Sequence, residues 1–162
     1  MAKYQNFELR EFIESDVATT RKIDNFPTFA VVQHLDELVG KILQPLRIAW
    51  AAADGHGSGL RITSGYRCRE LNTAIGGVSN SAHLSGYAAD VRPMNGKDEE
   101  FIIFAEKWLK RENIAFDQSI LEKKGKITWW HISLKGDFNR QRKQFLAIDT
   151  MLGKARKLEY TG

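Results

Sequence analysis

The sequence predicts an α+β fold in which N-terminal helices pack on a small, mostly antiparallel sheet. Apolar residues recur at three- and four-residue spacing from Thr28 onward, which is typical of helices. The second half contains short alternating segments instead, and residues 115–122 and 127–134 flank Lys124-Gly125 as the two strands of a hairpin would. Helices that come first, followed by strands, are typical of an α+β domain.

The first half is expected to be mainly helical. Ser15 and Asp16 can cap a short helix over residues 17–23, before Pro27. A long helix then begins at Thr28, and Pro45 should kink or restart it before it continues over residues 46–53. The apolar face of this helix comprises Phe29, Val32, Leu35, Leu38, Val39, Ile42 and Leu43.

The second half is expected to alternate strands, helices and loops. These are a loop over 54–59, a strand over 60–66, a helix over 67–75, a loop over 76–80, a strand over 87–91, a helix over 97–111, the hairpin, and a helix over 139–156. We therefore expect one domain over residues 1–162, with an N-terminal arm over 1–27 and a basic, helical tail over 138–162.

Composition excludes several classes of protein. A net charge of +4 without a dense basic block argues against nucleic-acid binding. No apolar run is long enough for membrane insertion, and the first residues lack the apolar core of a signal peptide, so we expect synthesis in the cytoplasm. Cys68 is the only cysteine, which excludes an internal disulfide and a cysteine-based zinc site. The sequence carries no signal for oligomeric state.

Three residues far apart in the sequence form a candidate metal-ligand set. They are His83 and Asp90, in the segment SAHLSGYAADV, and His131, in TWWHISL. Two imidazoles and a carboxylate are a complete set for catalytic zinc, because three protein ligands leave the fourth tetrahedral position open. His34 is set aside as an exposed helix residue and His56 as a solvated loop residue.

The sequence around these residues resembles the zinc D-Ala-D-Ala carboxypeptidase family. That family includes vancomycin-resistance dipeptidases and phage endolysins, and its fold is shared with the hedgehog signalling domain and the lysostaphin-type peptidases. The matching motifs are Ser81-x-His83-x-x-Gly86-x-Ala88-x-Asp90, Trp130-His131-Ile132-Ser133, residues 62–67, Leu71-Asn72, Gly76-Gly77, Phe116-Asp117-Gln118, Glu122, and the N-terminal pieces 7–12 and 23–25.

The resemblance implies that His83, Asp90 and His131 bind one Zn²⁺ per chain. It also implies that the substrate is peptidoglycan or its stem peptides, cut by a D-Ala-D-Ala carboxypeptidase or by an endolysin-like endopeptidase. A protein made without a secretion signal would reach the wall only after release, which favours phage or prophage lysis.

The catalytic base is less directly indicated. The dipeptidase branch has a glutamate three positions before the last histidine, where this chain has Thr128. The hedgehog-like arrangement instead favours Glu122, after Phe116-Asp117. A tight turn at Lys124-Gly125 would place Glu122 opposite Ile127, about 13 Å from His131 along the strand. Asp117 is therefore the alternative base, or else it accepts a hydrogen bond from a ligand histidine and orients its ring.

Four further residues are expected to contact the substrate. The resemblance gives Arg67 the task of holding it, and a guanidinium can bind a carboxylate through two hydrogen bonds; a surface ion pair is the alternative. Ser81 either binds the substrate backbone or caps a loop. Trp129 shares a strand face with His131, whereas Trp130 should point into the core, and Gln118 is expected on the same site floor as Trp129.

Two other functions remain open at this stage. The same fold can hold zinc without catalysis in a module that binds the cell wall or a protein, as in the hedgehog domain. A wall-anchoring domain without any metal is a third possibility.

Overall fold

A computed structural model of the protein describes residues 4–151 and 154–157. The N-terminal half is helical, as predicted, with α1 (Leu9–Ile13), α2 (Asp16–Arg21), α3 (Phe29–Leu38) and α4 (Gln44–Ala53). A π-helical segment, Val39–Leu43, joins α3 to α4. Pro45 lies in the first turn of α4, so the predicted irregularity is present but begins before the proline. Because Pro45 has no backbone N–H, it cannot make a regular helical hydrogen bond, and the wider π-helical turn before it tolerates this loss.

Within the described residues, the second half forms one six-stranded sheet and two further α-helices. Its order is β1 (Leu60–Ser64), β2 (Ala88–Pro93), β4 (Ile127–Ser133), β3 (Gln118–Lys124), β5 (Gln144–Asp149) and β6 (Lys154–Lys157). The remaining helices are α5 (Arg69–Ala74), α6 (Asp98–Arg111) and the 3-10 turns Ala82–Ser85 and Phe138–Arg140. Of the strand pairings that the described residues form, only β3–β5 is parallel, so the predicted mostly antiparallel α+β fold is confirmed.

The prediction of a helix over residues 139–156 is wrong. Residues 144–149 form β5, which pairs with the outer edge of β3, and residues 154–157 form β6 beside it. Pairing with the edge of β3 overrides local helix propensity here. As in any strand, the side chains alternate: Phe145 and Ala147 face one side of the sheet, and Leu146 and Ile148 face the other. Residues 152–153 and 158–162 of the predicted tail, and 1–3 of the predicted arm, lie outside the described residues.

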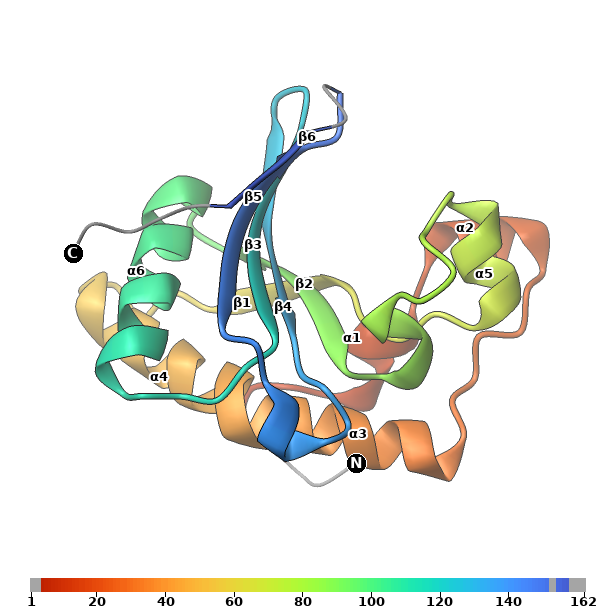
Figure 1. The fold of residues 1–162 in the computed structure, drawn as a ribbon, viewed down its shortest axis with the longest axis horizontal. Coiled ribbons are helices and arrows are strands. Elements are labelled where there is room, and N and C mark those ends of the chain that lie inside the picture. Colours follow the sequence, from red (N-terminus) through yellow and green to blue (C-terminus); the bar gives the residue numbers. More distant parts are fainter. Residues whose placement is uncertain (1–3, 152–153, 158–162) are drawn as a thin grey trace.

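The helices α4 and α6 lie on one face of the sheet and enclose the core (Figure 1). Trp130 is fully buried there, as predicted, with its ring centroid 5.7 Å from that of Phe101 on α6. Its indole N–H donates to Ser119 Oγ at 2.8 Å. Because side chains alternate along a strand, His131 points to the opposite face, which α1 and α5 flank.

The loop after β1 is held by the N-terminal arm. Tyr66 N donates to the carbonyl of Phe12 in α1 at 2.7 Å. Asn25, which is buried, donates to the carbonyls of Ile13 and Tyr66 and accepts from Cys68 N. These bonds fix the backbone from residue 66 to residue 68.

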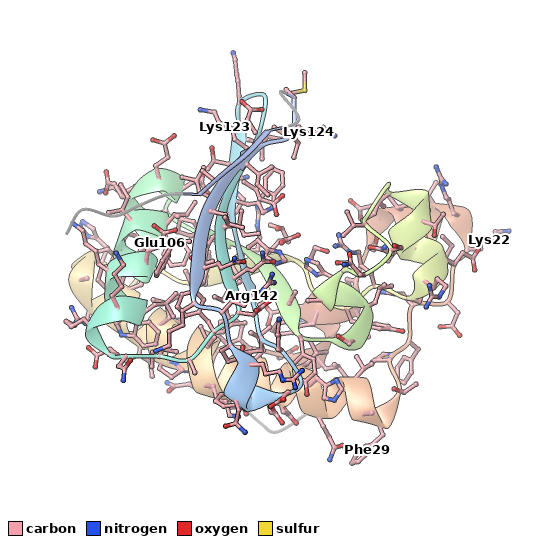
Figure 2. The ribbon with its side chains drawn as sticks, in the orientation of Figure 1. Lys22, Phe29, Glu106, Lys123, Lys124 and Arg142 are labelled. Carbon is pink, nitrogen blue, oxygen red and sulfur yellow. The ribbon has the colours of Figure 1, made fainter. Side chains whose placement is uncertain are left out.

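An ion pair between Arg142 and Asp117 holds the start of β5 against the sheet. The carboxylate of Asp117 is buried, and Arg142, labelled in Figure 2, donates to it through Nε and Nη2, each at 2.7 Å. Lys135 Nζ lies 3.8 Å away. Burial alone would raise the pKa of Asp117, but the hydrogen bonds and charge of Arg142 outweigh it and leave this pKa below its ordinary value.

Gly65→Ala should destabilise the protein, because α1 lies directly on this glycine. A Cβ at residue 65 would lie 2.6 Å from the carbonyl oxygen of Phe12, a backbone atom that cannot turn aside. We expect the free energy of unfolding to fall by about 1–3 kcal/mol in urea titrations. Gly59→Ala is the control: its Cβ would meet only the exposed side chain of Met94, and the change should stay within about 0.5 kcal/mol.

Asp117→Asn should destabilise the protein by about 1–3 kcal/mol at neutral pH, because it removes charge-assisted hydrogen bonds. The folded-state pKa of Asp117 is lowered, so its contribution is present above the unfolded pKa of about 3.9 and disappears as pH falls through the folded value. The difference between wild type and variant, measured by denaturation at several pH values, should therefore shrink below about pH 4. A difference that stays constant with pH would contradict this assignment.

Candidate metal centre

The three predicted ligands come from two neighbouring strands and the turn that precedes one of them. Asp90 in β2 pairs directly with His131 in β4, so both side chains project from the same face of the sheet. His83 lies in the 3-10 turn Ala82–Ser85. Ser81 caps this turn, and its Oγ accepts from His83 N at 3.3 Å. The imidazoles of His83 and His131 are buried.

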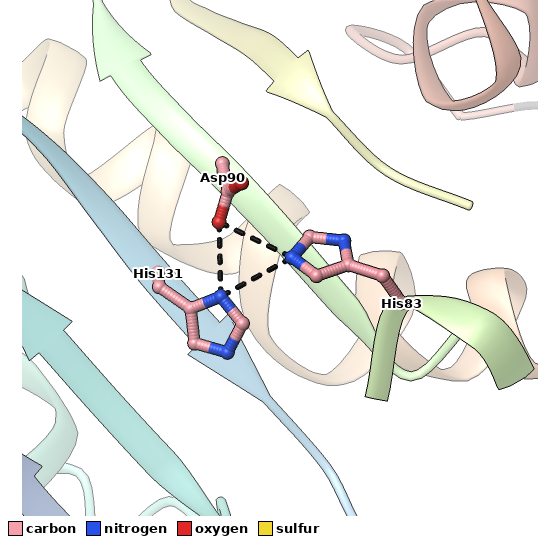
Figure 3. A group of neighbouring side chains, drawn as sticks. All are labelled: His83, Asp90 and His131. Carbon is pink, nitrogen blue, oxygen red and sulfur yellow. Dashed lines mark hydrogen bonds and ion pairs between the residues drawn. The ribbon is translucent and has the colours of Figure 1, made fainter. Parts of the chain in front are cut away.

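The donor atoms of these residues converge on one point (Figure 3). His83 Nε2 lies 3.3 Å from both His131 Nδ1 and Asp90 Oδ1, and His131 Nδ1 lies 2.9 Å from Asp90 Oδ1. Two donors that are each about 2.1 Å from a tetrahedral zinc ion are about 3.4 Å apart. The spacing and the donor types therefore fit one small divalent cation.

The orientation of His83 is fixed from behind. Its Nδ1 lies 2.6 Å from the carbonyl oxygen of Gly65, which can only accept, so Nδ1 carries the proton. Nε2, which faces Asp90 and His131, then keeps its lone pair. Burial lowers the pKa of His83, which also favours the neutral form. The Gly65 carbonyl is a functional group that the sequence analysis missed.

Asp90 is ionised in this arrangement. Burial alone would raise the pKa of its carboxyl group, but the charge of His83 and the hydrogen bonds from His131 and His83, in their protonated forms, outweigh burial and hold that pKa well below its ordinary value. A bound divalent cation would take the place of those protons. A carboxylate and a neutral imidazole nitrogen with a free lone pair are the ligand forms that a divalent cation requires.

Glu122 lies closer to this cluster than the predicted turn allowed. The hairpin pairs Lys124 with Ile127, so the turn is Gly125-Lys126, one residue later than predicted, and Glu122 stands opposite Trp129. Glu122 therefore shares a face with His131, and its Oε1 lies 4.0 Å from His131 Nδ1. Burial and, secondly, the charge of Asp90 raise the pKa of Glu122.

Arg67 and Ser81 lie at the side of the cluster. Arg67 N donates to the carbonyl of His83 at 3.1 Å, and its Nη2 lies 3.4 Å from Ser81 Oγ. The Nε of Arg67 is buried without a hydrogen-bond partner among the described residues. Burial lowers the pKa of this guanidinium, while Asp90 and Glu122 counteract that effect. Arg67 thus has an unused N–H donor beside the cluster.

The other predicted residues divide into two groups. Trp129 is half-buried on the His131 face, and Gln118 faces the same side, where it donates to Gln144 Oε1 at 3.1 Å. The carboxylate of Asp117 is bound by Arg142, and none of its hydrogen bonds or ion pairs within the described residues reaches the three candidate ligands.

His34 differs from its predicted environment. It is half-buried rather than exposed, and its Nδ1 lies 2.6 Å from the carbonyl oxygen of Ser85. The helical spacing contained this signal, because residue 34 follows Val31 by three positions and precedes Leu38 by four, and both of those residues are buried. His56 is exposed in its loop, as expected.

Comparison with known proteins identifies the family. The family model described as Peptidase M15 matches residues 5–121, which is well over half of the chain and includes His83 and Asp90. A comparison with curated proteins found no match. Across the described residues, no helix has the length and apolar character needed to span a membrane. The chain belongs to the Peptidase M15 family, which consists of zinc-dependent metallopeptidases.

Proposed function

We propose that the protein hydrolyses a peptide bond in the stem peptides of peptidoglycan, with one zinc ion bound by His83, Asp90 and His131. The observation that carries this proposal is the convergence of three donor atoms at 2.9–3.3 Å in a member of a zinc peptidase family. The cleavage is either that of a D-Ala-D-Ala carboxypeptidase or that of an endolysin-like endopeptidase. The proposed site of action is the cell wall, as in phage or prophage lysis.

Bound zinc would supply a polarised substrate carbonyl and a water that is acidic near neutral pH. The residues around it supply the rest of the chemistry. His83 Nδ1 and the Gly65 carbonyl keep one ligand in a single tautomer, and the β2–β4 pairing keeps the other two side by side. These contacts therefore hold the three metal-binding atoms in a rigid arrangement that needs no change before the reaction.

Glu122 is the proposed general base. Its carboxylate accepts a proton from the attacking water and then delivers it to the nitrogen of the leaving amine. Its position supports this role, since it is diagonal to His131 on the same face and 4.0 Å from Nδ1 of that residue. Asp117, the alternative base, is less suited because Arg142 already occupies both of its oxygens.

Arg67 is the proposed anchor for a substrate carboxylate. Its position supports this, because its backbone N–H donates to the carbonyl of His83 and its guanidinium lies against Ser81 beside the cluster, where a positive charge favours an anionic partner. Ser81 holds the other end of this guanidinium and is placed to bind the substrate backbone. Trp129 and Gln118 extend the same face and would form the wall and floor of the substrate site.

Metal removal tests the proposal directly. The purified protein should contain about one zinc ion per chain and should release amino groups from purified cell wall. A chelator should abolish this release, and added zinc should restore it. His83→Ala should lower activity by at least about 100-fold, because the remaining two ligands cannot hold the ion in place. Full activity of His83→Ala would refute the proposed site.

Glu122→Gln separates catalysis from metal binding. We expect kcat to fall by about 10²- to 10⁴-fold while the Kd for zinc stays near the wild-type value, since the amide cannot accept the proton. Glu100→Gln, at an exposed position of α6, is the matched control and should leave both values unchanged. If Glu122→Gln retains full activity, Glu122 is not the base. If the wild-type protein binds zinc without cleaving any wall preparation, the alternative of a non-catalytic zinc-containing binding module is favoured.

A further inference from the structure

The segment between His83 and Asp90 rests on α3 through a histidine that is not one of the metal ligands. His34 Nδ1 lies 2.6 Å from the carbonyl oxygen of Ser85. The ring of His34 also stacks on that of Tyr87, with the centroids 4.0 Å apart and the planes inclined by 15°. One side chain therefore contacts both ends of the corner formed by residues 85–87.

This corner fits closely against α3. Gly86 has a φ of 76°, and a Cβ there would lie 2.8 Å from the carbonyl oxygen of Val31. Leu35, one helical turn further along, would also be in contact, at 3.4 Å. Only glycine meets both requirements without strain, so the corner and the helix surface of Val31, His34 and Leu35 form one packed unit.

The same corner connects two of the three candidate ligands. Ser85 comes two residues after His83, and Tyr87 comes three residues before Asp90. Tyr87 is fixed to the sheet as well, since its carbonyl accepts from Leu134 N at 2.8 Å. A shift of the corner would therefore move His83 relative to Asp90, whose position the β2–β4 ladder fixes.

We propose that His34 is a positioning residue for the metal centre: its hydrogen bond to Ser85 and its stacking on Tyr87 set the separation of His83 and Asp90, and thereby the affinity for zinc. The proposal rests on the zinc site of the proposed function but not on peptidase activity. It requires one specific tautomer, because a carbonyl oxygen accepts only from a protonated Nδ1.

Two variants separate the hydrogen bond from packing, and a third serves as the control. His34→Phe keeps an aromatic ring against Tyr87 but removes the donor, whereas His34→Gln keeps an N–H donor. His56→Ala, which removes an exposed histidine, is the matched control. We expect His34→Phe to weaken zinc binding by about 10- to 100-fold, the range typical of groups that orient metal ligands. His34→Gln should restore most of the affinity, and His56→Ala should match the wild type.

Two quantities are measured for each variant. One is the Kd for zinc, obtained by competition with a chromophoric chelator, and the other is the free energy of unfolding of the metal-free protein in urea. A purely structural role would lower the unfolding free energy of His34→Phe and leave the Kd of the folded protein unchanged, and that result would overturn the proposal. Nitrogen-detected NMR of the wild-type imidazole gives a test that needs no variant: a proton on Nε2 rather than Nδ1 would also overturn it.

These results remain distinguishable from failure of the proposed function. If the wild-type protein binds zinc but cleaves no peptide, the peptidase assignment fails while the effect of His34 on affinity can still be observed. If cleavage is present and His34→Phe binds zinc as the wild type does, the peptidase assignment stands and the role of His34 is refuted.

Discussion

The direct pairing of Asp90 with His131 is the constraint on which the rest of the site depends. Strand partners share a face, so this register brings a carboxylate and an imidazole together from residues far apart in the chain. A slip of one residue in either strand would turn one of the two side chains into the helical core. Burial of Trp130 and Val91 on the core face opposes such a slip, because each would then be exposed. Core packing thus maintains the ligand geometry.

The two faces of the sheet have different tasks. One face is apolar and covered by α4 and α6, while the other presents Asp90, His131, Glu122, Trp129 and Gln118. The candidate ligand that does not come from the sheet, His83, is bound by the carbonyl of Gly65, and the residues that follow it, 85–87, pack on α3. The N-terminal helices accordingly contribute to the site although none of them supplies a ligand.

Much of this arrangement could be predicted from sequence, and the failures have physical causes. The ligand set could be found because ligand types are few and the motif around His83 and Asp90 is local. The hairpin turn was placed one residue early because Lys124-Gly125 and Gly125-Lys126 are both plausible two-residue turns. Each contains Gly125, whose φ of 61° suits a tight hairpin turn. That single residue decided whether Glu122 could approach His131.

Other features depend on tertiary contacts that no local pattern encodes. Residues 144–149 form a strand only because β3 offers a free edge, so propensity alone predicted a helix. The environment of His34 depends on a turn that lies 51 residues away in the chain. A carbonyl such as that of Gly65 has no sequence signal at all, since every residue carries one.

The π-helical segment between α3 and α4 has a consequence for how the chain can vary. Such a segment contains one more residue than a regular turn, and each residue of a helix advances its rotational phase by about 100°. The extra residue lets α3 present Val31, His34 and Leu35 to the 85–87 corner while α4 directs Leu46 and Trp50 into the core. An insertion or deletion of one residue in this helix would therefore rotate one half by about 100° relative to the other and separate the fit at the corner from the packing of the core.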